Sequence, residues 1–177
     1  MQASLKKRLD ESDIFQYGLI NPSQVRYLAE VRQLCQDNCC GCYGTTWACP
    51  PAVGSVDDCR ARCLRFEHMV IFSIKYNIKG SFDYEGMRQS MADFKKSALK
   101  LNDSLRGIFS DYAILSNESC DRCQSCTYPG EPCRFPEQLH HSIEGYGIYV
   151  HEVAKLAGVV YNNGPDTVTF FGAILYN

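Results

Sequence analysis

The sequence predicts an α/β fold, with α+β as the alternative, in which helices pack on a small mixed sheet that carries two cysteine-rich metal-binding loops. Three observations lead to this prediction: an apolar run typical of a buried strand, a long amphipathic helical pattern directly after it, and eleven cysteines in two groups. At 177 residues, 45% of them hydrophobic, the chain can bury roughly 70% of its unfolded surface. We expect a single domain over residues 1–177, with cysteine-rich loops at about 35–63 and 120–136 and an αβ body at about 64–119 and 140–177.

Two helix starts are visible before and inside the first cysteine group. Asn21 is a good cap, Pro22 suits the first helical position and Gln24 completes a capping box, which predicts a helix to about Leu34. Residues 35–54 are rich in glycine, proline and cysteine and predict irregular loop. A second cap at residues 55–58 predicts a short helix to about Phe66, with Cys59, Cys63 and Phe66 on one face.

The αβ body begins with residues 69–76, which predict a buried strand. A helix of about 22 residues follows from Asp83 or Tyr84, because apolar residues recur at steps of four and three: Met87, Met91, Phe94, Ala98, Leu101, Leu105 and Ile108. A strand at 112–116 comes next, and a strand–helix–strand crossover predicts that the two strands run parallel. We expect the chain to close with a helix over 148–157, stopped by Gly158, and a hairpin of 159–161 with 167–176.

Composition excludes several classes of protein. The formal charge of −2 gives no basic surface for nucleic acid. The N-terminus lacks the apolar core of a secretory signal, and no apolar run is long enough to span a bilayer. We therefore expect a cytoplasmic protein that binds neither nucleic acid nor membrane. In a reducing compartment, clustered thiols indicate metal or redox chemistry rather than disulfides.

The second cysteine group has the more regular spacing. Cys120, Cys123 and Cys126 follow one another at steps of three, and Cys133 comes after Pro132. A run of three cysteines can reach three irons of a 4Fe–4S cubane, with a fourth thiolate from farther away. Zinc, the alternative, usually takes two separate Cys-x2-Cys pairs. The spacing favours the cubane, and Arg122 and Arg134 are placed to offset its negative charge.

The first cysteine group leaves more alternatives open. Cys35, Cys40, Cys49 and Cys59 can together hold a second cluster, and Cys39, Cys42 and Cys63 are then surplus. Another pairing places Cys49 on the cluster of the second group and Cys133 on that of the first, because ferredoxins exchange fourth ligands in this way. Tyr43 and Trp47 lie in the same loop and can shield a cluster from water.

These motifs resemble a family of uncharacterised, predicted metal-binding proteins of iron–sulfur type. The resemblance covers the chain from about residue 25 to the end and is carried by two signatures, from Cys35 through Trp47 and Cys49-Pro50-Pro51 to Cys59, and from Cys120 through Pro132-Cys133-Arg134 to Gly147. It implies a small cytosolic protein of anaerobic microbes. It also implies eight cysteine ligands: Cys35, Cys40, Cys49, Cys59, Cys120, Cys123, Cys126 and Cys133.

The motifs predict a protein with two 4Fe–4S clusters that transfers single electrons to or from a redox protein partner. One alternative is an enzyme whose cluster keeps an open iron for a small molecule; the catalytic residues and the substrate are not indicated. Another is a zinc-stapled interaction module. The four histidines are scattered, and His140 and His141 are expected to have ordinary surface roles.

Overall fold

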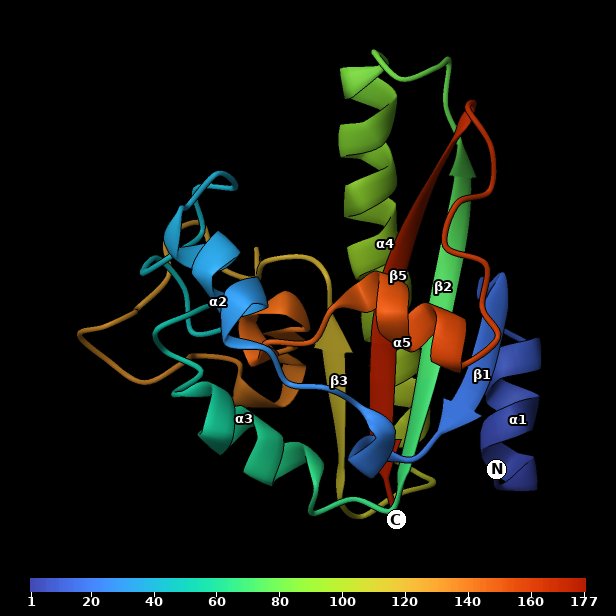
Figure 1. Cartoon of the computed structure of the whole chain (residues 1–177), viewed down its shortest axis with the longest axis horizontal. Helices are drawn as coiled ribbons and strands as arrows, with labels where there is room; N and C mark the ends of the chain where they lie inside the picture. The colour runs from blue at the N-terminus through green and yellow to red at the C-terminus, as the bar shows by residue number, and fades with distance from the viewer.

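The computed structural model describes residues 1–177 and contains a five-stranded mixed sheet in the order β1-β2-β5-β3-β4 (Figure 1). The long strand β5 lies in the middle and is antiparallel to both β2 and β3, whereas β3 and β4 are parallel. The predicted α/β class is therefore confirmed. The strands span β1 Gln16–Ile20, β2 His68–Asn77, β3 Tyr112–Ser116, β4 His141–Ser142 and β5 Thr167–Tyr176.

Strands β2 and β3 run parallel, as predicted for a strand–helix–strand crossover, but they are not neighbours in the sheet. Both strands are antiparallel to β5 and therefore parallel to each other, yet β5 lies between them. The predicted closing hairpin was wrong, because residues 159–161 form no strand. Instead β5 pairs with β2 over ten residues, from Thr167 opposite Asn77 to Tyr176 opposite His68.

Five α-helices surround the sheet, and three short 3₁₀ turns join the loops. The α-helices are α1 Ala3–Asp10, α2 Ala29–Gln36, α3 Val56–Cys63, α4 Tyr84–Leu105 and α5 Val150–Leu156. The 3₁₀ turns are η1 Pro22–Gln24, η2 Pro136–Gln138 and η3 Glu144–Tyr146. The predicted cap of α3 at Ser55 is present, and α4 begins at Tyr84 as predicted, with Asp83 as its N-cap. No helix has both the length and the apolar content that crossing a bilayer requires.

The helix predicted from residue 21 to 34 is broken into two pieces. The capping box of Asn21 and Gln24 forms, but the turn ends at Val25, whose backbone is extended. Tyr27 then forms a β-bridge with Ile148, and α2 begins only at Ala29. Pairing with a distant segment thus overrides the local helical pattern, which a single sequence does not reveal.

Two apolar cores lie on opposite faces of the sheet, as expected from the alternation of side chains along a strand. Val70, Phe72 and Ile74 of β2 pack with α1 and α4 on one face, and Met69 and Ile71 pack with α3 and α5 on the other. Figure 1 shows α4 behind the sheet and α5 in front of it. Both cysteine-rich segments lie to the left of β3, beyond this layered body.

Candidate metal centres

The four cysteines of the second group line one small hollow. Cys120, Cys123, Cys126 and Cys133 are all half-buried, and the hollow holds only about 20 Å³ of free space. Arg122 and Arg134 also line it, as the sequence predicted. Burial raises the pKa of the Cys120 thiol, and the Arg122 backbone amide and charge act in the opposite direction. We call these four cysteines the second centre.

Short contacts bring Cys133 back to the three preceding cysteines. The Arg134 Nη1 atom donates to the Ser125 carbonyl at 2.9 Å, and the Thr127 hydroxyl donates to the Pro132 carbonyl at 2.9 Å. The Glu131 amide also donates to the Thr127 carbonyl at 3.0 Å. The segment is therefore folded on itself, although it contains no helix or strand.

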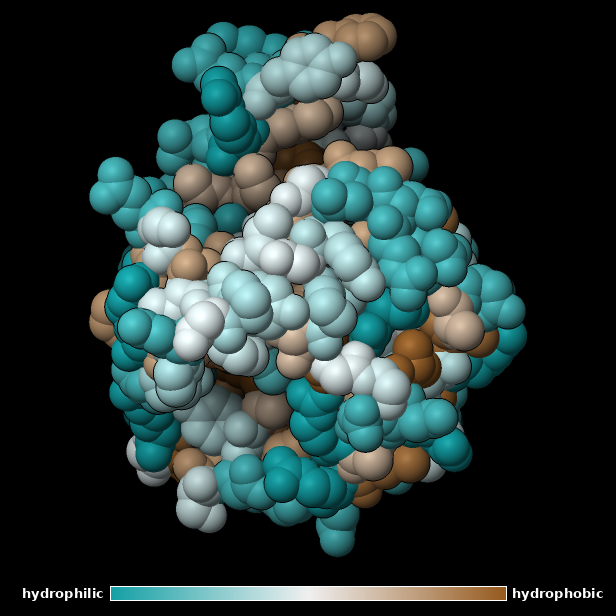
Figure 2. Space-filling view, turned by 90° about the vertical axis from the view of Figure 1, so that its left-hand side faces the viewer, coloured by the Kyte–Doolittle hydropathy of each residue, from teal (hydrophilic) through white to brown (hydrophobic).

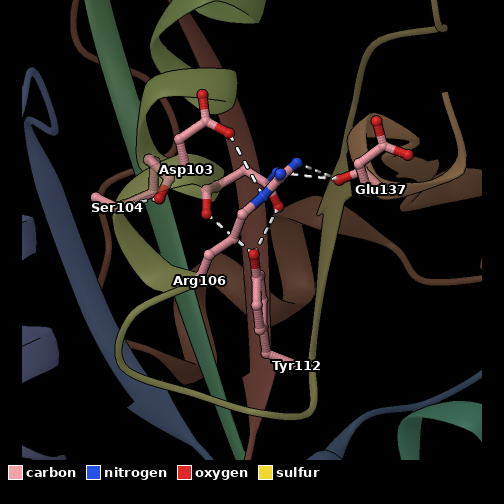
Figure 3. A network of polar contacts seen from close by, with 7 residues as sticks. Asp103, Ser104, Arg106, Tyr112 and Glu137 are labelled. Atoms are coloured by element: carbon pink, nitrogen blue, oxygen red, sulfur yellow. Dashed lines mark hydrogen bonds and ion pairs between the residues drawn. The ribbon is translucent and has the colours of Figure 1, made fainter.

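The end of the second cysteine segment is tied to helix α4, as Figure 3 shows. The Glu137 carbonyl accepts hydrogen bonds from Asn102 Nδ2 at 3.1 Å and from Arg106 Nη2 at 3.3 Å. The Tyr112 hydroxyl lies 3.0 Å from the Asn102 carbonyl and 3.1 Å from its Oδ1 atom. The Asn102 side chain of α4 therefore links Tyr112, the first residue of β3, to Glu137 at the end of the cysteine segment.

Trp47 comes from the first cysteine segment but covers the second centre. Its Nε1 atom donates to the Glu131 carbonyl at 3.1 Å, and its ring meets Tyr128 edge-on at 4.9 Å. It lines the hollow of the second centre together with Leu139. The shielding role expected of Trp47 thus falls on the second group of cysteines and not on its own.

Most of the first cysteine group lies on the wall of a larger cavity of about 750 Å³. Cys35, Cys39, Cys40, Cys42 and Cys49 line it, together with Tyr43. Burial raises the pKa of the Cys49 thiol to about 12, and the neighbouring Cys42, Cys40 and Cys35 thiols contribute in the same direction. These interactions place Cys35, Cys40, Cys42 and Cys49 near one another. We call these four cysteines the first centre.

Cys59 lies elsewhere, although the sequence grouped it with Cys35, Cys40 and Cys49. It is fully buried in the core between the sheet and α3, as is its neighbour Cys63. The Cys59 sulfur donates to the Val53 carbonyl at 3.3 Å and lies 3.5 Å from Arg32 Nη2 and 3.4 Å from Arg62 Nη2. The structure therefore brings three of the four predicted residues to one cavity, with Cys42 in the place expected for Cys59.

The wall of the cavity facing the cysteines carries charged residues that the sequence analysis did not single out. Glu118 follows β3, Glu144 belongs to η3, and Lys95 projects from α4. Burial raises the pKa of each glutamate to about 7. Lys95 forms an ion pair with Asp121 at 3.2 Å. Only the position of Glu118 directly after a predicted strand was a usable signal for this wall.

The two centres lie next to each other. Trp47 lines the hollow of the second centre, and Cys49, two residues later, lines the cavity of the first. Between them, the Ala48 carbonyl accepts the Ser142 amide at 2.9 Å, which joins this segment to the end of β4. Ser119 lines the cavity of the first centre and directly precedes Cys120 of the second.

His140 and His141 do not have the surface roles predicted for them. Both are half-buried, and burial lowers the pKa of each to about 4. His141 Nδ1 lies 2.7 Å from the Tyr146 hydroxyl. His140 shares a small pocket with Cys120, and its buried Nε2 atom has no hydrogen-bond partner in the protein. His141 belongs to β4, which pairs with β3, and His140 directly precedes it.

The donor set of each centre was compared with what a metal group requires. No three cysteine, histidine or acidic side chains meet closely enough to hold a single metal ion. A cubane binds each of its four thiolates to a different iron, so the thiolates surround it and need not meet at one point. Five cysteines line the cavity of the first group and four line the hollow of the second, and the unpartnered His140 Nε2 beside Cys120 gives the second centre a free hydrogen-bonding group. The cysteines of each group can therefore offer several thiolate ligands to a metal group.

Comparison with known proteins assigns a family but no reaction. No match was found among the curated proteins or among the solved structures. A family model, described as predicted metal-binding protein (DUF2284), matches residues 18–176, and this span includes all eleven cysteines. The chain therefore belongs to this family of predicted metal-binding proteins.

Proposed function

We propose that this metal-binding protein carries two 4Fe–4S clusters and transfers single electrons between a redox protein partner and its first centre. The observation that carries the proposal is the segment Trp47–Cys49, which contributes to the walls of both cavities. Two redox groups joined by such a short piece of chain are suited to exchange electrons with each other. Each cluster, when bound, accepts or gives up one electron at a time.

The ligands of the second centre are Cys120, Cys123, Cys126 and Cys133. Trp47 and Leu139 cover them from the side of the first loop. Arg122 and Arg134 bring positive charge to the same hollow, which favours the more negative, reduced state of a group bound there. An enclosed site with nearby cations is suited to electron transfer, because water and solutes are kept from the metal.

The ligands of the first centre are Cys35, Cys40, Cys42 and Cys49. We choose Cys42 over the sequence-predicted Cys59 because Cys42 lies on the cavity wall, whereas Cys59 is enclosed by Arg32, Arg62 and Val53. Bringing Cys59 to the cavity would require α3 to unpack from the core. The alternative pairing that exchanges Cys49 and Cys133 is not favoured, because each residue lines the cavity of its own group.

Metal analysis of protein purified without oxygen tests this proposal. We expect a brown protein with about eight irons and eight acid-labile sulfides per chain, as two 4Fe–4S clusters require. Reduction should produce the electron paramagnetic resonance signals of reduced clusters. A colourless protein with one or two zinc ions per chain would contradict the proposal and favour a zinc-stapled interaction module.

A further inference from the structure

We propose that the cavity beside the first centre binds a small organic cation, namely a protonated or methylated amine. The inference rests on the proposed function only in placing this ligand next to a redox centre. The cation site itself is formed by side chains that do not bind metal. It would give the protein a small-molecule ligand in addition to its redox partner.

The first reason is the space that remains beside the cysteines. The cavity of about 750 Å³ lies within the range of small-molecule sites, about 300–1,000 Å³. The cysteines come from α2 and the loop after it, and the rest of the lining comes mainly from α4, η3 and α5, with η3 packed against α2. Figure 2 looks onto this side of the molecule and shows brown apolar atoms at the bottom of recesses in a mainly polar surface.

The second reason is an excess of negative charge in the cavity lining. Neither Glu118 nor Glu144 has a cation within ion-pair distance. The carboxyl group of Glu144 is surrounded by protein, and its one side-chain partner is the Ser142 hydroxyl at the long distance of 3.4 Å. Lys95, the basic residue of this cavity, is paired with Asp121 at 3.2 Å and influences Glu118 only from beyond ion-pair distance. A buried carboxylate without a cation is unfavourable, and a bound cation removes this cost.

The third reason is the type of surface around these carboxylates. Three tyrosines line the cavity, Tyr43 near the cysteines and Tyr149 and Tyr161 near the carboxylates. The Tyr161 ring is held in place by stacking on Phe171, with a centroid distance of 5.1 Å and an angle of 15°. Aromatic faces attract organic cations, and apolar neighbours such as Met91 and Val150 accommodate their alkyl groups. An inorganic cation would gain little from these walls.

The combination of carboxylates and aromatic side chains in this cavity also argues against anions and uncharged molecules as ligands. An anion would meet two carboxylates and the thiolates of the first centre, and the one lysine present is already paired. An uncharged molecule would fit the apolar walls but would leave both carboxylates without a cation. The cavity therefore discriminates by charge, and this discrimination is what an experiment can measure.

Equilibrium dialysis of the anaerobic holoprotein with radiolabelled choline tests this inference. The matched probe is 3,3-dimethylbutan-1-ol, which has the shape of choline without its charge and is measured by competition. We expect choline to bind at least tenfold more tightly than the alcohol. We expect Glu144→Gln to weaken choline binding about tenfold, which corresponds to about 1.4 kcal/mol, and Glu118→Gln to act in the same direction. Glu85→Gln, an exposed change in the first turn of α4, should have no effect.

Three outcomes would overturn the inference: no saturable binding of choline, equal binding of choline and the alcohol, or unchanged binding in both glutamine variants. Iron content and circular dichroism are measured on the same samples. Glu118→Gln serves as the second variant if Glu144→Gln does not fold. Normal iron content without choline binding refutes the cation site alone, whereas absence of iron refutes the proposed function and leaves the binding result interpretable.

Discussion

The two cysteine groups offer the same ligands in very different surroundings. The second group lines a hollow of about 20 Å³ covered by Trp47, whereas the first lies on the wall of a cavity of about 750 Å³ that also contains carboxylates, a lysine and tyrosines. The number and spacing of cysteines therefore indicate where metal binds but not what the metal can reach. Under the proposed function, the enclosed centre is the one suited to electron transfer and the larger cavity is the one with room for a small molecule.

Replacing a ligand of the second centre should have the largest effect. In Cys123→Ser, the enclosed cluster loses one of four thiolates, and we expect the iron content to fall from about eight to about four per chain. The matched control is Ser125→Ala, because only the backbone carbonyl of Ser125 is used, by Arg134. Iron and sulfide analysis of anaerobic samples gives the result. Retention of all eight irons in Cys123→Ser would show that this residue is not a ligand.

Substitution of Cys42 and of Cys59 tests which of the two is a ligand of the first centre. Cys42→Ser should lose about four irons, because it removes a thiol from the cavity wall. Cys59→Ser should keep about eight irons and lower the free energy of unfolding, because it changes a fully buried side chain that contacts two arginines. Iron analysis and urea unfolding measure the two effects. The reverse pattern of iron loss would restore the pairing predicted from the sequence.

The choice between Cys42 and Cys59 shows where sequence reasoning stops. The strand and helix of the αβ body, the caps at Ser55 and Asp83 and the grouping of the second cysteines all follow from local patterns. Cys59, Cys63 and Phe66 are buried in one core, as their predicted shared face requires, although α3 ends at Cys63 and Phe66 lies beyond the helix that was predicted to include it. Cys59 is enclosed in that core, and periodicity alone does not distinguish a core position from a ligand position.

The remaining errors also concern contacts between distant segments. Strand β5 is inserted between β2 and β3, and Tyr27 bridges Ile148 instead of continuing a helix. Helix α1 and strand β1 were not predicted, although Leu5 and Leu9 of α1 are completely buried against the sheet. Short elements of five to eight residues give weak periodic signals, so their formation depends on packing that only the folded chain provides.

A smaller effect is expected from replacing Trp47, which covers the second centre but not the first. Trp47→Phe removes the hydrogen bond to the Glu131 carbonyl and part of the cover over the second centre. We expect the second cluster to bleach a few-fold faster in air, while the initial iron content stays the same. Tyr43→Phe is the control, because Tyr43 lines only the first cavity. Absorbance decay after exposure to oxygen measures both rates, and equal rates would show that Trp47 does not protect the second centre.

The smallest expected effect concerns His141, which belongs to neither centre. It lies 2.7 Å from the Tyr146 hydroxyl, which also accepts a hydrogen bond from Arg62 at 3.0 Å. This network supports the core around Cys59 without contributing a metal ligand. His141 therefore provides a test of stability that should leave the iron of both centres unchanged.

Burial lowers the pKa of folded His141 to about 4, from an ordinary value of 6.5. The unfolded chain therefore binds a proton at His141 as pH falls below about 6.5, while the folded protein does not, and the stability contributed by neutral His141 is lost between pH 6.5 and 4. Glu144, whose folded pKa is raised to about 7, acts with the opposite sign, since it favours the folded state at low pH.

The effect of His141 must therefore be measured as a difference between wild type and His141→Asn. We expect urea unfolding to show that this difference shrinks by about 2 kcal/mol from pH 7 to pH 5, with iron content measured at both pH values. A difference independent of pH would mean that His141 keeps an ordinary pKa and that the core around Tyr146 is open to water.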